Sequence, residues 1–140
     1  MTGLDQVLII DDHPLFRGAL ASALKQAFPD SVSHEVGTLG GAVEILESDG
    51  LFDVVMLALN MAGINGFEGL MRLRTQFPRQ PVLVFAGSEN GRMVDEAIAC
   101  GAAGFLPKLP GHEILSTAIC TILKGDIYVP VPRLSISGGI

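Results

Sequence analysis

Two adjacent carboxylates, Asp11 and Asp12, follow a run of four apolar residues, and a lysine, Lys108, follows another apolar run late in the chain. Two carboxylates held together at the end of a strand repel each other unless a cation compensates them. Either Mg²⁺, which prefers oxygen ligands, or the lysine itself could supply that charge. These residues predict an acidic pocket closed by Lys108, although Asp12 would also suit the capping position of a following helix.

The other residues expected near this pocket offer little reactive chemistry. Ala58 and Ala86 end two further apolar runs, and Ser88 is the only hydroxyl expected near the pocket mouth. His13 follows the carboxylates and precedes Pro14, so a turn residue is a simpler interpretation than a ligand or a base. The chain has no G-x-S-x-G or H-E-x-x-H motif and no phosphate-cradling glycine loop. The sequence therefore favours a binding domain over an enzyme.

Positioning these residues requires a regular alternation of strands and helices. Apolar runs predict strands over Gln6–Asp11, Val32–Val36, Asp53–Leu59, Pro81–Ala86 and Gly104–Leu106. Apolar residues at helical spacing predict helices over residues 14–28, 39–47, 67–77, 91–100 and 111–124. Five such βα units imply an α/β fold, with a parallel sheet and helices on both faces. Sites in such sheets form at the carboxyl ends of the strands, where the residues above fall.

Three local features refine this plan. Val32–Val36 is predicted at an edge of the sheet, because it carries His34 and Glu35. Asn60–Gly66 contains two glycines and is predicted as a loop. Gly101 is predicted to end the fourth helix, because glycine adopts the left-handed conformation that often follows a helix.

Length, composition and charge limit the functional classes. A chain of 140 residues, 49% of them hydrophobic, fits one domain with a large core. The formal net charge of −6 argues against binding to the phosphate backbone of nucleic acid. The sequence shows no run long enough to span a membrane and no signal peptide, so a cytoplasmic protein without membrane contact is predicted.

The domain itself is predicted to occupy residues 1–125. Residues 126–140 contain Pro130 and Pro132 and are interpreted as a tail or linker toward an output domain that is not part of these 140 residues. The tripeptide Tyr128-Val129-Pro130 could still pack back on the domain.

Four segments together resemble the receiver domain of bacterial response regulators. In chain order they read IIDDHPLFRGAL, DVVMLALNMAGINGFEGL, PVLVFAGSEN and GAAGFLPK. The start of the chain resembles the subgroup in which the receiver precedes a LuxR-type helix-turn-helix domain. The resemblance covers about residues 5–125 and implies a CheY-like (flavodoxin-like) fold, a doubly wound, five-stranded parallel sheet in the order 2-1-3-4-5.

The resemblance also implies a role for each strand-end residue. Members of the family accept a phosphoryl group from a histidine kinase on an aspartate that ends the third strand, with the help of Mg²⁺. The metal-binding pair falls on Asp11 and Asp12, with the backbone carbonyl of Asn60 as a further ligand. The lysine that contacts the phosphoryl oxygens falls on Lys108, and the aromatic switch falls on Phe105.

The chain departs from the family at the two positions that carry the chemistry. Ala58 stands at the phosphoacceptor position, and Ala86 stands where a hydroxyl would bind the phosphoryl group. A methyl group cannot accept a phosphoryl group, so no catalytic residue is predicted. Without the third carboxylate, the Mg²⁺ site is expected to be weak or unoccupied. Lys108 is then expected to pair directly with Asp11 or Asp12, as a fixed tie.

The resulting prediction is a degenerate receiver domain of a two-component transcription regulator. It would act independently of phosphorylation and without a cofactor, as a dimerisation or partner-docking module. Expected partners are a second copy of the chain, an output domain, and a histidine kinase or other regulator, with no DNA binding by this segment alone. Members of this subgroup often associate through the first and last helices, or through the fourth helix, fifth strand and fifth helix.

Two alternatives remain open at this point. One is phosphorylation of a residue other than the usual aspartate, for which Ser88 is a weak candidate. The other is a small-molecule sensor, with its ligand in the crevice beside Ala58 and Ala86. We interpret the chain as a fragment of a longer regulator.

Overall fold

The computed structural model of the chain describes residues 4–61, 64–87, 91–108 and 110–130. Five strands form one parallel sheet in the order β2-β1-β3-β6-β7. They are β1 (Gln6–Ile10), β2 (Val32–Val36), β3 (Val54–Ala58), β6 (Val82–Ala86) and β7 (Gly104–Pro107). Counted along the chain, this is the predicted order 2-1-3-4-5, and β2 lies at an edge as predicted.

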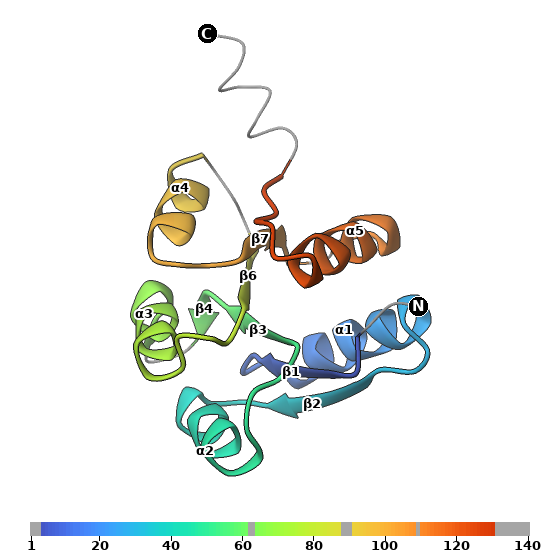
Figure 1. The fold of residues 1–140 in the computed structure, drawn as a ribbon, viewed down its shortest axis with the longest axis horizontal. Helices are drawn as coiled ribbons and strands as arrows, with labels where there is room; N and C mark the ends of the chain where they lie inside the picture. The colour runs from blue at the N-terminus through green and yellow to red at the C-terminus, as the bar shows by residue number, and fades with distance from the viewer. Residues whose placement is uncertain (1–3, 62–63, 88–90, 109, 131–140) are drawn as a thin grey trace, which may run out of the picture.

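Five helices connect these strands and cover the sheet. They are α1 (Pro14–Ala27), α2 (Leu39–Asp49), α3 (Gly66–Gln76), α4 (Gly91–Ala99) and α5 (His112–Leu123). Figure 1 shows α1 and α5 on one face of the sheet, with α2, α3 and α4 on the other. None of the helices among the described residues is long and apolar enough to cross a bilayer.

The centre of the sheet is buried on both faces. Every residue of β3 and β6 is buried, and the four apolar residues of β1 are completely inaccessible to solvent. Consecutive apolar residues suit strands that are covered on both sides, which is why the sequence shows unbroken runs there. The strand order reverses at β1 and β3, so the residues that follow these strands lie where such sheets form their sites.

Two local predictions have different outcomes. Gly101 has a φ of 98°, and the Ala102 N–H bonds to the Ala97 carbonyl at 3.0 Å, so the predicted helix end is confirmed. The prediction of a simple loop over residues 60–66 is wrong in part. β4 (Asn60–Met61) and β5 (Ile64–Asn65) form a short antiparallel pair there. Strands of two residues are too short to show an alternating pattern in the sequence.

Candidate functional site

The two carboxylates lie directly after β1, at the carboxyl edge of the sheet. Asp11 is completely buried, whereas the side chain of Asp12 is 27% exposed. Asp11 Oδ1 accepts a hydrogen bond from the His13 backbone N–H at 3.2 Å. Asp11 Oδ2 has no hydrogen bond from any described residue. A buried carboxylate oxygen in this position requires a nearby positive charge.

Lys108, the residue after β7, supplies that charge. Its Nζ lies 3.7 Å from Asp11 Oδ2 and 4.8 Å from the centre of the Phe16 ring. The Phe16 ring in turn packs 5.3 Å from the Phe85 ring of β6, centre to centre. The expected pair between Lys108 and one of the carboxylates is therefore present, with Asp11. A carboxylate and an aromatic face together hold the ammonium group in place.

His13 is more than the turn residue that the sequence indicated. Its Nδ1 lies 3.1 Å from Asp11 Oδ1, 3.1 Å from Asp12 Oδ1 and 3.4 Å from Lys108 Nζ. His13 is also the N-cap residue of α1, with no capping bond from its side chain. The expectation that Asp12 caps this helix is wrong, because Pro14 takes the first helical position and leaves the cap to His13.

Arg17 is a second residue that the sequence reasoning missed. Its Nη1 donates a hydrogen bond to the Asp11 backbone carbonyl at 2.6 Å, and its Nε lies 3.5 Å from Glu35 Oε1 on β2. Arg17 lies one helical turn after His13, and its backbone N–H bonds to the His13 carbonyl. The spacing of four residues places Arg17 and His13 on the same face of the helix, so it could have predicted that Arg17 also points at the carboxyl edge of the sheet. Arg17 thereby holds the backbone at Asp11 against β2.

Two alanines occupy the central strand ends of this edge. Continuing the β1–β3 register by one residue sets Asp11 opposite Ala58, the last residue of β3. The β6–β7 register sets Ala86 opposite the residue before Lys108. Ala58 and Ala86 are 3% and 2% exposed. The strand ends therefore bring two methyl groups to the place where the neighbouring strands bring carboxylates and a lysine.

The remaining predicted site residues lie around this cluster. Phe105 is completely buried in β7, where it pairs with Val84. Asn60 belongs to β4, two residues after the end of β3, and its role as a carbonyl ligand stays a prediction. Ser88 lies outside the described residues.

The donor atoms at this edge do not fit a Mg²⁺ site of the kind the resemblance implies. Asp11, Asp12 and His13 bring three ligand atoms within 4.8 Å of one another, but one of the three is a nitrogen. The second oxygen of Asp11 already faces Lys108. Mg²⁺ requires a near-octahedral set of oxygen ligands, and the chain offers no carboxylate at position 58. The geometry is that of a cluster in which Lys108 takes the position of a cation beside Asp11.

Comparisons with known proteins agree with this architecture. The model of the response regulator receiver domain family matches residues 7–119. A glycerol metabolism activator from Pseudomonas putida is 36% identical over 125 residues, which cover 89% of this chain and 57% of that protein. The nitrate/nitrite response regulator protein NarP of Escherichia coli is 32% identical over 121 residues, covering 86% and 56%. The chain thus spans less than two thirds of the length of these relatives.

Solved structures show the same fold. A LuxR family DNA-binding response regulator from Silicibacter pomeroyi has a TM-score of 0.79 at 32% identity, covering 92% of this chain and 99% of that one. The signal receiver domain of a DNA-binding response regulator from Colwellia psychrerythraea has a TM-score of 0.76 at 25% identity, covering 86% and 98%. The chain belongs to the response regulator receiver domain family, among relatives of the LuxR and NarL type.

Proposed function

We propose that this receiver domain signals without being phosphorylated. The observation that carries the proposal is Ala58, a methyl group at the end of β3 where the family has its phosphoacceptor aspartate. Phosphoryl transfer to a side chain needs a nucleophilic atom, and a methyl group has none. The pair of Lys108 with Asp11 supports the same function, because the cation that would contact phosphoryl oxygens already has a carboxylate partner.

The partners that we propose are proteins. One relative is a transcriptional activator from Pseudomonas putida, 30% identical, of which the chain covers 58%. By analogy, this domain would work inside a longer transcription regulator and control its output domain. A histidine kinase or another regulator would be the upstream partner. The domain itself would bind and regulate, and would not catalyse a reaction.

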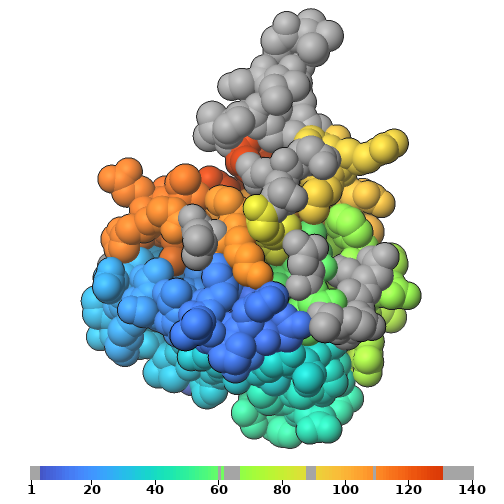
Figure 2. All heavy atoms as spheres, turned by 180° about the vertical axis from the view of Figure 1, so that it is seen from behind, coloured from blue at the N-terminus to red at the C-terminus, as the bar shows by residue number. Residues whose placement is uncertain are grey.

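The surface that we propose for a second copy of the chain is formed by α1 and α5. These helices contact each other, and Figure 2 shows the blue surface of α1 adjoining the orange surface of α5. Leu15 on α1 is 91% exposed and Ile114 on α5 is 43% exposed. The stretch from Ile114 to Leu123 contains no charged residue. By contrast, α4 exposes Arg92 and Glu96, so this stretch of α5 offers a smaller desolvation penalty on association than α4 does.

Leu15→Glu is expected to weaken self-association about tenfold or more, because it would bury a charge in an apolar contact. Met71→Glu is the matched control, since Met71 is also exposed, at 47%, but lies on α3 across the sheet. Sedimentation equilibrium would give the dimer dissociation constants. It would be run with and without acetyl phosphate and Mg²⁺, and the constant is expected to be the same in both. A monomeric wild-type chain, equal effects of the two variants, or a phosphate-dependent constant would each contradict the proposal.

The two alternative functions stay predictions. Phosphorylation at Ser88 concerns a residue outside the described part of the chain. Among the described residues, nothing favours a metabolite beside Ala58 and Ala86, since both side chains are almost completely buried.

A further inference from the structure

The segment that follows α5 turns back onto the sheet. Gly125 has a φ of 92°, a backbone conformation that glycine adopts without strain. The Gly125 N–H bonds to the Ile122 carbonyl at 2.9 Å, and the Asp126 N–H bonds to the Thr121 carbonyl at 3.1 Å. These bonds close the end of the helix and send the chain toward β7. Residues 126–130 are called the latch below.

The latch pairs with the outer edge of β7 in the manner of a sixth strand. The Tyr128 N–H donates to the Ala103 carbonyl at 3.0 Å, and the Phe105 N–H donates to the Tyr128 carbonyl at 3.2 Å. Together these bonds form a parallel bridge between Tyr128 and Gly104. The sequence had allowed Tyr128-Val129-Pro130 to pack back on the domain, and the structure confirms that they do.

Side-chain size at position 104 makes this close approach feasible. A Cβ atom at Gly104 would lie 2.9 Å from the Tyr128 carbonyl oxygen and 3.2 Å from the Tyr128 Cβ. Glycine therefore gives the latch room to dock. Tyr128 and Val129 are partly buried against the core, and Pro130 is buried.

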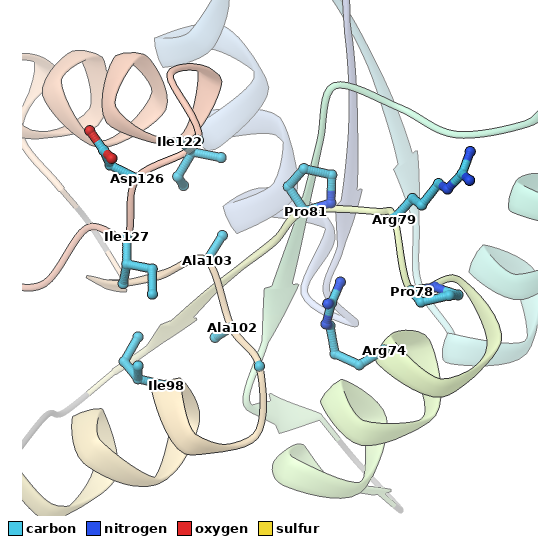
Figure 3. Close-up of a pocket in the computed structure, with 12 residues that line it drawn as sticks. Arg74, Pro78, Arg79, Pro81, Ile98, Ala102, Ala103, Ile122, Asp126 and Ile127 are labelled. Atoms are coloured by element: carbon cyan, nitrogen blue, oxygen red, sulfur yellow. The ribbon is translucent and has the colours of Figure 1, made fainter.

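The other flank of the latch is open. A groove of about 310 Å³ runs beside it, as Figure 3 shows, with Asp126 and Ile127 on the latch side. Ile98 of α4 and Ala102 also line the groove, and Figure 3 shows Arg74 and Pro78 across from the latch. Ile127 is 56% exposed at this groove. The latch bonds to the sheet through the edge strand β7 alone, so its release would break no bond between the five strands.

The strand that holds the latch also carries two of the site residues. Phe105 lies in β7 with a completely buried ring, and its backbone N–H is one of the two donors to the bridge. Lys108 follows β7 and is tied to Asp11. A shift of β7 that frees Lys108 or moves Phe105 would therefore also strain the bridge to Tyr128.

We propose that the latch is a conformational readout of β7. It stays docked while β7 holds Phe105 and Lys108 as observed, and it opens when β7 shifts, which releases Tyr128 from the edge of the sheet. Coupling of this kind is reciprocal, so release of the latch must also loosen β7. This inference is independent of phosphorylation, since any partner that moves β7 would be read out in the same way.

Hydrogen exchange measured by NMR on the 140-residue chain tests the docking. The Tyr128 amide is expected to be protected in the wild-type chain. Tyr128→Pro removes this donor and is expected to raise exchange of the Phe105 amide about tenfold or more, with β1 and β3 unchanged. Ile127→Ala, which trims an exposed side chain and leaves both bonds, is the control. An unprotected Tyr128 amide, or a Phe105 amide that does not respond, would overturn the proposal.

A pair of core variants tests the coupling. Phe105→Leu in β7 and Phe52→Leu both remove a buried ring, but the Phe52 ring packs on His34 of β2, at the edge of the sheet away from the latch. Phe105→Leu is expected to raise exchange of the Tyr128 amide about tenfold more than Phe52→Leu does. Equal effects of the two variants would indicate general destabilisation and would overturn the proposed readout.

Discussion

The variant Ala58→Asp is expected to take up one phosphoryl group per chain from acetyl phosphate in the presence of Mg²⁺. The new carboxylate would stand at the end of β3, opposite Asp11 in the sheet register. Three carboxylates at one edge make an oxygen-rich site that Mg²⁺ can bind, and the added one is a nucleophile. Lys108, one residue beyond the end of β7, would then have phosphoryl oxygens to contact. Intact-mass spectrometry would measure the adduct, with EDTA as the negative condition.

Ala58→Asn is the matched control for this variant. It has nearly the same size as aspartate but lacks the nucleophilic carboxylate, so it is expected to stay unmodified. An unmodified Ala58→Asp chain would contradict the view that the rest of the receiver scaffold is intact.

The same variant is expected to become dependent on Mg²⁺ for stability. Without metal, a third carboxylate beside Asp11 and Asp12 should lower the free energy of unfolding by about 1–3 kcal/mol. Mg²⁺ at about 100 times its dissociation constant should restore about 2.7 kcal/mol, because it binds only the folded state. Urea unfolding with Mg²⁺ and with EDTA measures both quantities. Equal stability in the two conditions would show that no metal site had formed.

Ala86 should still limit the response of this variant. A phosphorylated Ala58→Asp chain has no hydroxyl at the end of β6 to bond the phosphoryl group, so its dimer dissociation constant is expected to change little. The double variant with Ala86→Thr is expected to gain phosphate-dependent association. Full phosphate-driven dimerisation of Ala58→Asp alone would show that the hydroxyl is unnecessary.

The second large effect is expected from Lys108→Met. This change keeps an apolar stem of similar length beside Phe16 but removes the cation that faces the completely buried Asp11 carboxylate. A buried charge that loses its partner is strongly destabilising, so the free energy of unfolding should fall by about 2–4 kcal/mol. Lys124→Met is the control at an exposed lysine beyond α5, and it should change stability by less than about 0.5 kcal/mol.

A double-mutant cycle separates the ion pair from other effects of Lys108. Asp11→Asn removes the charge that Lys108 compensates, so the double variant should lose less stability than the sum of the two single variants, by about 0.5–3 kcal/mol. If the stability losses of the two single variants were strictly additive, the pair would contribute nothing to stability. The same would follow if the Lys108→Met chain were as stable as the Lys124→Met chain.

The architecture of this chain was predictable because the sheet is parallel and covered on both faces. That burial turns β1, β3 and β6 into unbroken apolar runs, and the helices between them show apolar residues at helical spacing. The residues directly after the strands could then be assigned to one edge. This reasoning placed Asp11, Ala58 and Lys108 at the same edge, because the place of a residue at a strand end is set by the backbone alone.

Features that depend on side-chain placement, or on pairing between segments far apart in the chain, could not be predicted from the sequence. The position of His13 Nδ1 between two carboxylates depends on its rotamer, and the clamp by Arg17 depends on how α1 docks. The bridge of Tyr128 to Gly104 joins segments separated by α5, and a single bridging residue leaves no periodic pattern. The proline-containing tail therefore resembled a linker, although its first part is docked on β7.

This chain is expected to keep the receiver scaffold while Ala58 removes the residue that would accept a phosphoryl group. Intact-mass spectrometry of the wild-type chain after incubation with acetyl phosphate and Mg²⁺ tests it most directly, with Ala58→Asp treated in parallel. We expect the wild-type mass to be unchanged while the variant gains one phosphoryl group. A stoichiometric phosphoryl adduct on the wild-type chain, at any residue, would contradict the account.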